Sequence, residues 1–472
     1  MNMSSNPFPA KGRLHRFRAL RWSSAALLAF LFLLGAAQAA ERPNIVIFLA
    51  DDLGYGSVGY QGGKPKTPNL DTLAKDAVRF TGFYTGSCNC SPSRASLLTG
   101  RSATRVGIYN WRPVRSPMVL RGSEVTLAEL LRGADYRTGV FGKWHLGEVM
   151  PREGVFTPAD HGFEHSFVTD LNAAPSHRNP ANFIRNGVAV GESQGYSCQL
   201  VVDEALRVLE TLKPGETFFH YIPFHEPHVP LASPEELVKG YPDATQEEAV
   251  YYANVENIDR AIGRYLAALK TRGQSANTLV LFASDNGPVP PGSSGGLRGQ
   301  KETLYDGGIK VPALLAWPSR IPKPCTISEP VALVDVMPTL CEAAGVAAPA
   351  DRVLDGTSFL PLLTGGTFTR AKPLFWFYFN RDPGAALRSG DWNLVARTTG
   401  FQPAAHHFTP EMMELVRNRS FDTFELFNLK ADPSQQNDLA ARHPEKLAEL
   451  KQQLLDSLAS ARAEGPDWRV AK

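Results

Sequence analysis

The sequence predicts an α/β protein in which a large, mixed and mostly parallel sheet is flanked by helices and followed by a smaller antiparallel unit. Strand and helix patterns alternate between residues 43 and 345, as in sheets with helices on both faces. The segments 43–50 and 278–283 are apolar on both faces, which is typical of buried parallel strands. The alternation stops after about residue 365, where short strand patterns follow one another.

The helices and strands of residues 43–345 are predicted from the spacing of apolar residues and from residues that favour the start of a helix. The strand at 43–50 ends at two acids, and a helix is expected from Thr67 and Pro68 through Val78, because threonine caps helices and proline fits the first turn. The later elements are predicted, in order, at 93–98 (helix), 127–131 (helix), 138–141 (strand), 200–212 (helix), 218–222 (strand), 246–270 (helix), 278–283 (strand), 313–317 (strand) and 333–344 (helix).

The C-terminal region is expected to form a smaller subdomain. Strand patterns lie at 373–379, 386–397 and 424–429, and a helix pattern lies at 444–463. We therefore divide the chain into an N-terminal targeting segment (1–39), a large domain (40–365) and a C-terminal subdomain (366–472) with an antiparallel sheet and a helix.

Composition excludes several classes of protein. The 472 residues are 43% apolar and 20% charged, which favours a packed core over general disorder. Residues 1–40 hold five basic residues and no acid, so the rest of the chain has three more acids than bases. This balance excludes a polybasic nucleic-acid-binding protein, and we expect no nucleic-acid partner. The composition also excludes a membrane protein with many spans.

The N-terminus has the order of a secretory signal peptide. A basic stretch up to Arg21 is followed by the uncharged apolar run 25–37 and by a small-x-small pattern ending at Ala39. Cleavage is expected after Ala39 or Ala40. The apolar run is short for a membrane span, so membrane association is expected only if this segment is retained. We expect an exported protein, periplasmic or secreted, or in a lysosome-type lumen if the host is eukaryotic.

Export permits disulfide bonds. If one of the five cysteines has another task, the other four can form up to two bridges, whose pairing the sequence does not give. A bridge between Cys88 and Cys90 would close a strained loop. Cys88 is therefore expected to be a buried small residue or to pair with a distant cysteine.

Acidic residues follow two of the predicted parallel strands. Asp51 and Asp52 follow the strand at 43–50, and Asp285 and Asn286 follow the strand at 278–283. Ligands of open α/β sheets bind beyond the carboxyl ends of the strands, so neighbouring strands would bring these side chains to one place. An all-oxygen set favours Ca²⁺ or Mg²⁺, and no histidine or cysteine spacing fits a tetrahedral zinc site. For either pair alone, a solvated loop acid is the simpler interpretation.

The stretch from Cys90 to Arg101 combines a cysteine with the start of a helix. Cys90 precedes a helix started by Pro92, where the positive end of the helix dipole attracts an anion. Arg94, one turn into the helix, can reach back towards the same anion. The residues alone leave two interpretations equally open, a nucleophile at an oxyanion site and a buried cysteine before an amphipathic helix.

This stretch resembles the signature of the formylglycine-dependent sulfatases, Cys-x-Pro-Ser-Arg followed by Leu-Thr-Gly-Arg. A second signature of that family is similar to residues 136–145, although Asp135 stands where the family usually has glycine. The overall sequence resembles the arylsulfatase A and N-acetylgalactosamine-6-sulfatase group. Further resemblances occur in the family's order over residues 42–345, at Asp51-Asp52, His225-Glu226-Pro227-His228-Val229-Pro230, Ser284-Asp285-Asn286-Gly287, Gly299-Gln300-Lys301 and Gly307-Gly308.

The resemblance implies an alkaline-phosphatase-like fold, a catalytic domain at 40–365 and a set of residue roles. A maturation enzyme would convert Cys90 to formylglycine, whose hydrated aldehyde attacks the sulfate sulfur and then releases sulfate. The resemblance also implies that one Ca²⁺ is bound by Asp51, Asp52, Cys90 (as formylglycine), Asp285 and Asn286. Its implied catalytic residues are Cys90, Arg94, Lys143 and Lys301 around the sulfate, His145 beside the diol and His228 as the acid for the leaving alcohol.

The expected function is sulfate-ester hydrolysis on a sulfated sugar, a polysaccharide or an aryl sulfate. His225 lies three residues from His228 and could exchange roles with it. A phosphomonoester or phosphonate hydrolase of the same superfamily is the alternative activity, because phosphate and sulfate have similar shapes. A binding protein that has lost the chemistry is disfavoured by the intact set of motifs.

Overall fold

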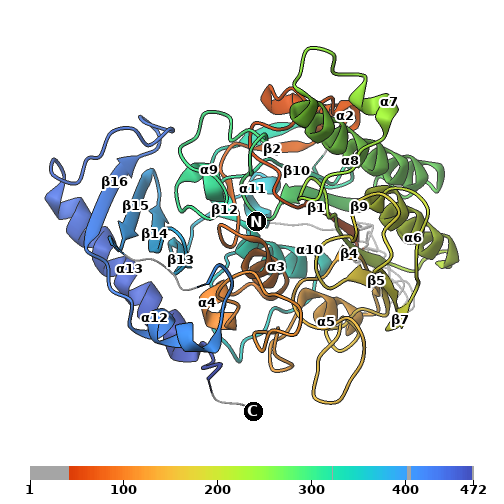
Figure 1. The fold of residues 1–472 in the computed structure, drawn as a ribbon. Coiled ribbons are helices and arrows are strands. Elements are labelled where there is room, and N and C mark those ends of the chain that lie inside the picture. Colours follow the sequence, from red (N-terminus) through yellow and green to blue (C-terminus); the bar gives the residue numbers. More distant parts are fainter. Residues whose placement is uncertain (1–41, 322, 401–404, 470–472) are drawn as a thin grey trace, which may run out of the picture. The chain divides into compact units, whose positions relative to one another are not determined.

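A mixed sheet of ten strands forms the centre of the compact unit at residues 42–472 in the computed structural model (Figure 1). The structure describes residues 42–321, 323–400 and 405–469, so the predicted signal peptide at 1–39 lies outside the described residues. The strand order is β11-β2-β10-β9-β1-β8-β4-β5-β6-β7. These strands are β1 (Asn44–Ala50), β2 (Val78–Phe80), β4 (Arg137–Lys143), β5 (His165–Thr169), β6 (Ile184–Arg185), β7 (Val188–Ala189), β8 (Phe218–Pro223), β9 (Thr278–Ser284), β10 (Ala313–Ala316) and β11 (Cys325–Ile327).

The middle of this sheet is parallel. β9, β1, β8, β4 and β5 run in one direction, β10 is antiparallel to both of its neighbours, and β6 and β7 turn back at the far edge. β1 pairs with β9 along its whole length, from Asn44 opposite Thr278 to Ala50 opposite Ser284. The structure thus confirms the predicted mixed, mostly parallel sheet, and it makes the two acid-terminated strands neighbours.

Both faces of the sheet are covered by helices, which explains why the interior positions of β1 and β9 are all apolar. Ile45 and Ile47 of β1 face one apolar cluster, whereas Val46 and Phe48 face the other, because successive side chains point to opposite faces. The first cluster includes α3 (Cys90–Thr99), α5 (Leu127–Arg132) and α10 (Val336–Ala344). The second includes α2 (Pro68–Asp76), α6 (Ser197–Thr211) and α8 (Gln246–Thr271), and Figure 1 shows these two helix groups on either side of the strands. Each fully buried aliphatic or aromatic side chain stabilises the fold by about 1.5–3 kcal/mol.

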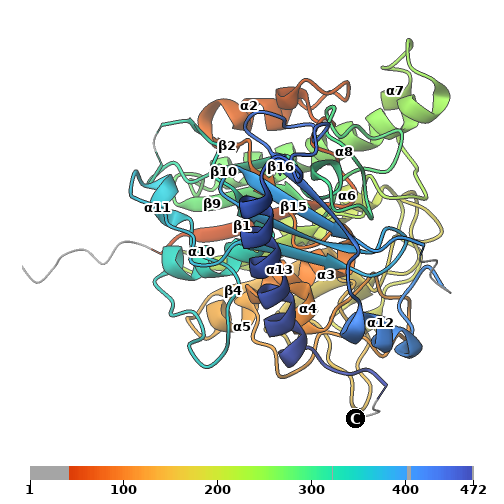
Figure 2. The ribbon, with the colours of Figure 1, turned by 90° about the vertical axis from the view of Figure 1, so that its left-hand side faces the viewer.

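A four-stranded antiparallel sheet with a long helix follows, as predicted. It consists of β13 (Leu374–Tyr378), β14 (Gly384–Ser389), β15 (Trp392–Arg397) and β16 (Thr423–Asn428) in sequence order. One face packs on Leu450, Leu454 and Leu458 of α13 (Pro444–Glu464), which crosses this sheet in Figure 2. The other face contributes Trp376 and Tyr378 to a cluster with residues of the central region.

The remaining elements are short. β3 (Phe83–Tyr84) and β12 (Val331–Ala332) form a separate parallel pair. The short helices are η1 (Gly59–Gln61), α4 (Ala103–Val106), α7 (Glu235–Val238), α9 (Asp306–Ile309), η2 (Leu333–Asp335), α11 (Leu360–Leu363), η3 (Pro410–Met412) and α12 (Met413–Asn418). Among the described residues, no helix is long and apolar enough to cross a membrane.

Two sequence-based expectations need correction. The strand predicted at 386–397 is a hairpin, because Gly390 adopts a left-handed φ of +57° and turns the chain between β14 and β15. The helix predicted to run through Val78 ends at Asp76, since Val78 joins β2 and pairs with β10 and β11. The sequence left the pairing of the cysteines open, and in the structure all five, which lie within the described residues, are free; Cys88 is buried, which is one of its two expected states.

Candidate active site

The carboxyl ends of β1 and β9 bring three carboxylates and an amide together. Asp51 and Asp52 leave β1, and Asp285 and Asn286 leave β9. The Asp52 backbone N–H donates to Asp285 Oδ1 at 3.2 Å, and Asn286 Nδ2 donates to Asp52 Oδ1 at 2.7 Å. All four residues are buried. The pairing of two parallel strands therefore builds the acidic half of the site.

Three basic side chains from other elements meet these acids. Lys143, at the end of β4, donates to Asp51 Oδ2 at 2.6 Å, and Lys301 Nζ lies 2.7 Å from Asp52 Oδ1. Arg94 of α3 donates to Asp285 Oδ2 through Nε at 3.0 Å and through Nη2 at 2.7 Å. Its Nη2 also lies 3.5 Å from Asp51 Oδ2. With every group ionised, three positive charges balance three negative ones.

This charge pairing decides the protonation of the acids. Burial would raise the pKa of Asp51, but Lys143, His228, Arg94 and Lys301 together hold that pKa well below its usual range. Burial and the neighbouring Asp51 carboxylate raise the pKa of Asp285 instead. Asp51 is therefore the firmly ionised acid at the centre of the cluster.

Cys90 lies at the amino end of α3 among these charges. The helix begins at Cys90 itself, with Asn89 as its extended N-cap, so the expectation that Cys90 precedes a helix at 93–98 is wrong, and the helix starts three residues earlier. Burial raises the pKa of the Cys90 thiol, and the positive charges of Lys143 and Lys301 only partly oppose this shift. The thiolate is the nucleophilic form of cysteine, so the encoded thiol is a weak nucleophile at neutral pH.

The histidines of the site differ in access. His145 is buried, its Nε2 lies 2.9 Å from the Arg112 carbonyl oxygen, and burial together with Lys143 lowers its pKa well below the usual value. His225 is also buried, and its Nε2 pairs with Thr169 Oγ1 at 2.8 Å. The side chain of His228 keeps 17% of its surface exposed, and its Nε2 lies 3.6 Å from Asp52 Oδ2. Of the pair His225 and His228, only His228 faces the acid cluster.

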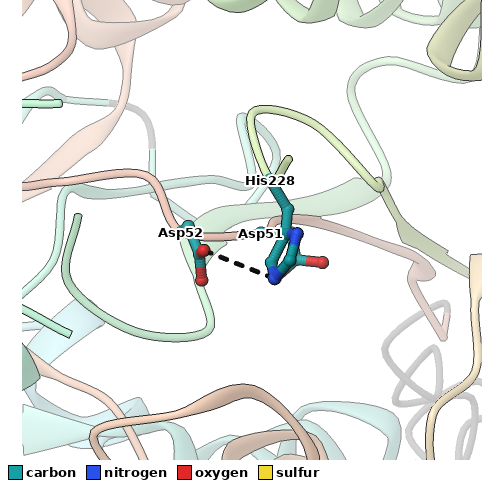
Figure 3. A group of neighbouring side chains, drawn as sticks. All are labelled: Asp51, Asp52 and His228. Carbon is teal, nitrogen blue, oxygen red and sulfur yellow. Dashed lines mark ion pairs between the residues drawn. The ribbon is translucent and has the colours of Figure 1, made fainter. Parts of the chain in front are cut away.

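Figure 3 shows how closely His228 approaches the two acids of β1. One potential ligand atom from each of Asp51, Asp52 and His228 lies within 4.8 Å of the others, and the dashed line marks the Asp52–His228 pair. On its other side, His228 Nδ1 lies 2.6 Å from the Val229 carbonyl oxygen and 3.1 Å from Asn172 Nδ2. These contacts fix the ring so that Nε2 points into the site.

Three residues of the site have a left-handed backbone. Asp52, His145 and Glu302 have φ values of +66°, +57° and +69°, and left-handed conformations are unfavourable for residues other than glycine. Gly142, which precedes Lys143, has a φ of +127°, and a Cβ there would lie 1.9 Å from the Pro223 carbonyl oxygen. Only glycine fits this close approach of β4 and β8, so the position of Lys143 beside the acids depends on the glycine before it.

Two further residues, Arg112 and Glu302, support the site, and sequence analysis did not identify either of them. The carbonyl of the fully buried Arg112 faces His145 Nε2, and the Arg112 backbone N–H donates to Ser91 Oγ at 3.2 Å. Glu302 follows Lys301, and its backbone N–H donates to the Cys88 carbonyl at 2.8 Å. Both contacts run through the backbone, which any residue type supplies, so the sequence carries no specific signal for them.

The donor atoms of the cluster fit a hard cation. Asp51 Oδ1 and Asn286 Oδ1 are buried oxygens that have no hydrogen-bond partner among the described residues. A buried oxygen without a partner is costly, and a cation bound between the two strand ends would satisfy both atoms. Carboxylate and amide oxygens are the ligands that Ca²⁺ and Mg²⁺ prefer. The residues present therefore fit the predicted kind of metal.

Comparison with known proteins identifies the family. Residues 43–346 match the protein-family model described as Sulfatase. The chain belongs to the sulfatase family. Residues 299–464 of this sulfatase also match the model described as N-sulphoglucosamine sulphohydrolase, C-terminal. The enzyme is accordingly a sulfuric ester hydrolase, and the family resemblance noted in its motifs is confirmed.

Its similarity to named sulfatases extends over most of the chain. It is 34% identical to human arylsulfatase A over 483 residues, which covers 92% of this chain and 91% of that protein. It is 33% identical to the N-acetylgalactosamine-6-sulfatase of Canis lupus familiaris over 390 residues, which covers 76% of this chain and 72% of that protein. Among solved structures, Ps i-CgsB in complex with k-i-k-neocarrahexaose is similar with a TM-score of 0.77 and 27% identity, covering 90% of this chain and 94% of that one.

Proposed function

We propose that this sulfatase is an exported enzyme that releases sulfate from a sulfated sugar, a polysaccharide or an aryl sulfate, using a formylglycine made from Cys90 and a bound calcium ion. The observation that carries the proposal is the position of Cys90 at the start of α3, where the charges of Lys143, Lys301, Asp51 and Asp285 all act on its side chain. A weakly nucleophilic, buried thiol at such a place favours conversion to another group. The names of the similar proteins, which include an N-acetylgalactosamine-6-sulfatase, support a sulfated sugar as substrate.

The proposed calcium ligands are Asp51, Asp52, Asp285, Asn286 and residue 90. The two unpartnered buried oxygens, Asp51 Oδ1 and Asn286 Oδ1, support this set. The balance of charge supports it too. Because three basic side chains already neutralise the three carboxylates, a divalent cation would leave the site with two net positive charges, which attract the singly charged sulfate ester.

When present, formylglycine would supply a hydrated aldehyde that attacks sulfur, and calcium would polarise the oxygens around it. We propose that Arg94, Lys143 and Lys301 stabilise the negative charge that develops on the sulfate oxygens. His145, held by the Arg112 carbonyl, would position the hydroxyl groups of residue 90. His228 is the proposed proton donor to the leaving oxygen, because its Nε2 points towards the acid cluster and its side chain keeps contact with solvent.

The proposal is tested by measuring inorganic sulfate release from sulfated monosaccharides, glycan fragments and a synthetic aryl sulfate. The protein is co-expressed with a formylglycine-generating maturation enzyme. Cys90→Ala should keep the fold and lower turnover by about a thousandfold or more, as loss of a covalent nucleophile commonly does. Cys325→Ala is the matched control, since Cys325 is exposed and should be replaceable without loss of activity.

Near-normal sulfate release by Cys90→Ala would refute the assigned nucleophile. Phosphate release from phosphate or phosphonate esters, without sulfate release, would favour the alternative activity. The mass of the peptide around Cys90 reports conversion to formylglycine, and the mass of the mature N-terminus reports cleavage after Ala39 or Ala40. An intact N-terminus in the exported fraction would contradict the signal peptide.

A further inference from the structure

We propose that Arg381, His406 and His407 form a subsite beside the catalytic centre that binds a second anionic group of the substrate, a sulfate or a carboxylate. This inference rests on the proposed function and narrows the substrate to sugars that carry more than one negative charge. It starts from the C-terminal region, which places these side chains next to the segments that hold Cys90 and Lys301.

Arg381 is an exposed arginine with unused hydrogen-bond donors. Its Nε lies 3.2 Å from Glu302 Oε2, whereas its Nη1 and Nη2 have no partner among the described residues. The side chain is 60% exposed. The backbone of Arg381 has a φ of +23°, and Asn380 Oδ1 accepts its N–H at 2.8 Å. Strain of this kind is retained where the surrounding structure fixes it, and it is frequent at binding sites.

Glu302 connects this arginine to the catalytic centre. It follows Lys301 directly, and its backbone N–H donates to the carbonyl of Cys88 at 2.8 Å. Its Oε1 pairs with His406 Nε2 at 2.7 Å, while its Oε2 holds Arg381. One carboxylate, on the residue that follows Lys301 in the sequence, thus orients both a guanidinium and an imidazole.

The loop that carries the two histidines is docked on the catalytic segments. Asn380 Nδ2 donates to the His406 carbonyl at 2.7 Å, and Asn110 Nδ2 donates to the same oxygen at 3.2 Å. Asn89, the N-cap of the helix that begins at Cys90, donates in turn to Asn110 Oδ1 at 2.5 Å. The ring of Trp111 lies 5.6 Å from the ring of His406 and 5.8 Å from that of His407. The imidazoles are therefore held in place before any ligand arrives.

The chemistry of this cluster suits an anion on a sugar better than a neutral hydroxyl. Nη1 and Nη2, which have no partner among the described residues, form a planar pair of donors that matches two oxygens of a sulfate or carboxylate. Within the described part of the chain, Glu302 is the one acid that pairs with Arg381 or His406, and both of its oxygens are already engaged with them. An incoming anion would therefore meet donors without displacing a carboxylate. The side chain of Arg381 is exposed and therefore accessible to a ligand.

The test compares substrates that differ only in the second charge. N-acetylgalactosamine 6-sulfate is compared with N-acetylgalactosamine 4,6-disulfate, and a 6-sulfated disaccharide with a uronate is compared with the same disaccharide reduced at its carboxyl group. For the unmodified sequence we expect the KM to be about five- to tenfold lower for the doubly charged member of at least one pair. The pair that responds tells whether the second group is sulfate or carboxylate.

Arg381→Ala should remove this preference, and Arg381→Lys should keep part of it, because lysine retains the charge but not the paired donors. The quantity measured is the ratio of kcat/KM for the doubly charged substrate to kcat/KM for its singly charged partner. A general loss of activity lowers both values and leaves this ratio unchanged. Arg320→Ala is the matched control, since Arg320 is an exposed arginine that lies over the ring of Trp317. It follows β10, which runs antiparallel to β9, so it lies at the end of the sheet opposite to the acids that follow β9. Its ratio should equal that of the unmodified sequence.

An unchanged ratio in Arg381→Ala, or no preference in the unmodified sequence, would overturn the subsite. Failure of the proposed function is read separately, as absence of sulfate release from every substrate including the aryl sulfate. In that case the subsite is tested by calorimetry with N-acetylgalactosamine 4,6-disulfate. The disulfate should bind Cys90→Ala at least about fivefold more tightly than it binds the double variant Cys90→Ala/Arg381→Ala. Equal binding by the two variants, or no detectable binding by either, would refute the subsite.

Discussion

Replacing Arg94 with methionine tests whether the buried ion pair holds the active site together. Methionine has a similar length but no charge, so Arg94→Met removes both hydrogen bonds to Asp285 Oδ2, the ion pair with Asp51 and the hydrogen bond to the Lys143 carbonyl. Asp285 would then keep only its hydrogen bond with the Asp52 N–H. The variant therefore leaves two neighbouring, fully buried carboxylates without the cation between them.

The expected cost follows from this burial. Breaking a buried pair by removing one partner destabilises a protein by about 3–5 kcal/mol, because the remaining charge is desolvated and unpaired. The exposed pair Arg264–Asp203 provides the contrast, since its side chains are 46% and 52% exposed. Loss of such a surface pair costs at most about 1 kcal/mol, so Arg264→Met is the matched control.

Urea unfolding followed by circular dichroism in a calcium chelator measures both costs. The double variant Arg94→Met/Asp285→Asn should be destabilised by less than the sum of its two single variants, because it removes the unpaired charge as well. A cost below about 1 kcal/mol for Arg94→Met, equal to that of the surface control, would refute the argument. Additive costs in the double variant would also refute it.

Three further predictions concern metal binding, catalysis and pH. Lys301→Met should tighten calcium binding measured by calorimetry while lowering sulfate release about a hundredfold, because it removes a cation that contacts Asp52 at 2.7 Å and that would also contact the sulfate; weaker calcium binding would contradict this. His228→Gln should lower kcat about a hundredfold for sugar sulfates but only a fewfold for an aryl sulfate with an acidic leaving group, since only the poor leaving group needs a proton; equal losses would contradict it. Burial would raise the pKa of Glu204, but hydrogen bonds from one histidine and two arginines lower it below its ordinary value. The stability that Glu204 contributes is therefore complete above about pH 4.5 and is lost as the pH falls towards the lowered folded-state pKa. The difference in urea midpoint between the unmodified sequence and Glu204→Gln should accordingly shrink from about pH 7 to about pH 3, and a difference that grows would contradict the assignment.

The sequence was sufficient for the central strands β1, β4, β8 and β9 and for the acidic half of the site, but β5 was not predicted. β1 and β9 are apolar on both faces and end at acids, so their parallel pairing alone brings Asp52 and Asp285 together. The short strands β2, β3, β11 and β12 escaped prediction, because two or three residues carry no detectable period. The β14–β15 hairpin escaped as well, since only Gly390 and Asp391 interrupt an otherwise continuous strand pattern.

The supporting contacts of the site depend on long-range packing that no local pattern encodes. Glu302 meets His406 across 104 positions of sequence and Arg381 across 79, and Arg112 contacts His145 through its carbonyl group. Family motifs indicate which residues surround the reacting group, but they do not indicate which segments hold those residues in place. The roles assigned to the individual site residues are predictions that the variants above test.

The balance of charge links the stability of the site to its proposed chemistry. Three basic side chains neutralise three buried carboxylates in the described structure, so the strand ends can come together before any metal ion binds. The same contacts must weaken metal binding, because Lys143 and Lys301 lie 2.6 and 2.7 Å from carboxylates that are also proposed calcium ligands. A site selected for metal affinity alone would omit these lysines. Their presence is explained if the lysines exchange a carboxylate for a sulfate oxygen when substrate binds, and this exchange predicts the opposite effects of Lys301→Met on calcium affinity and on turnover.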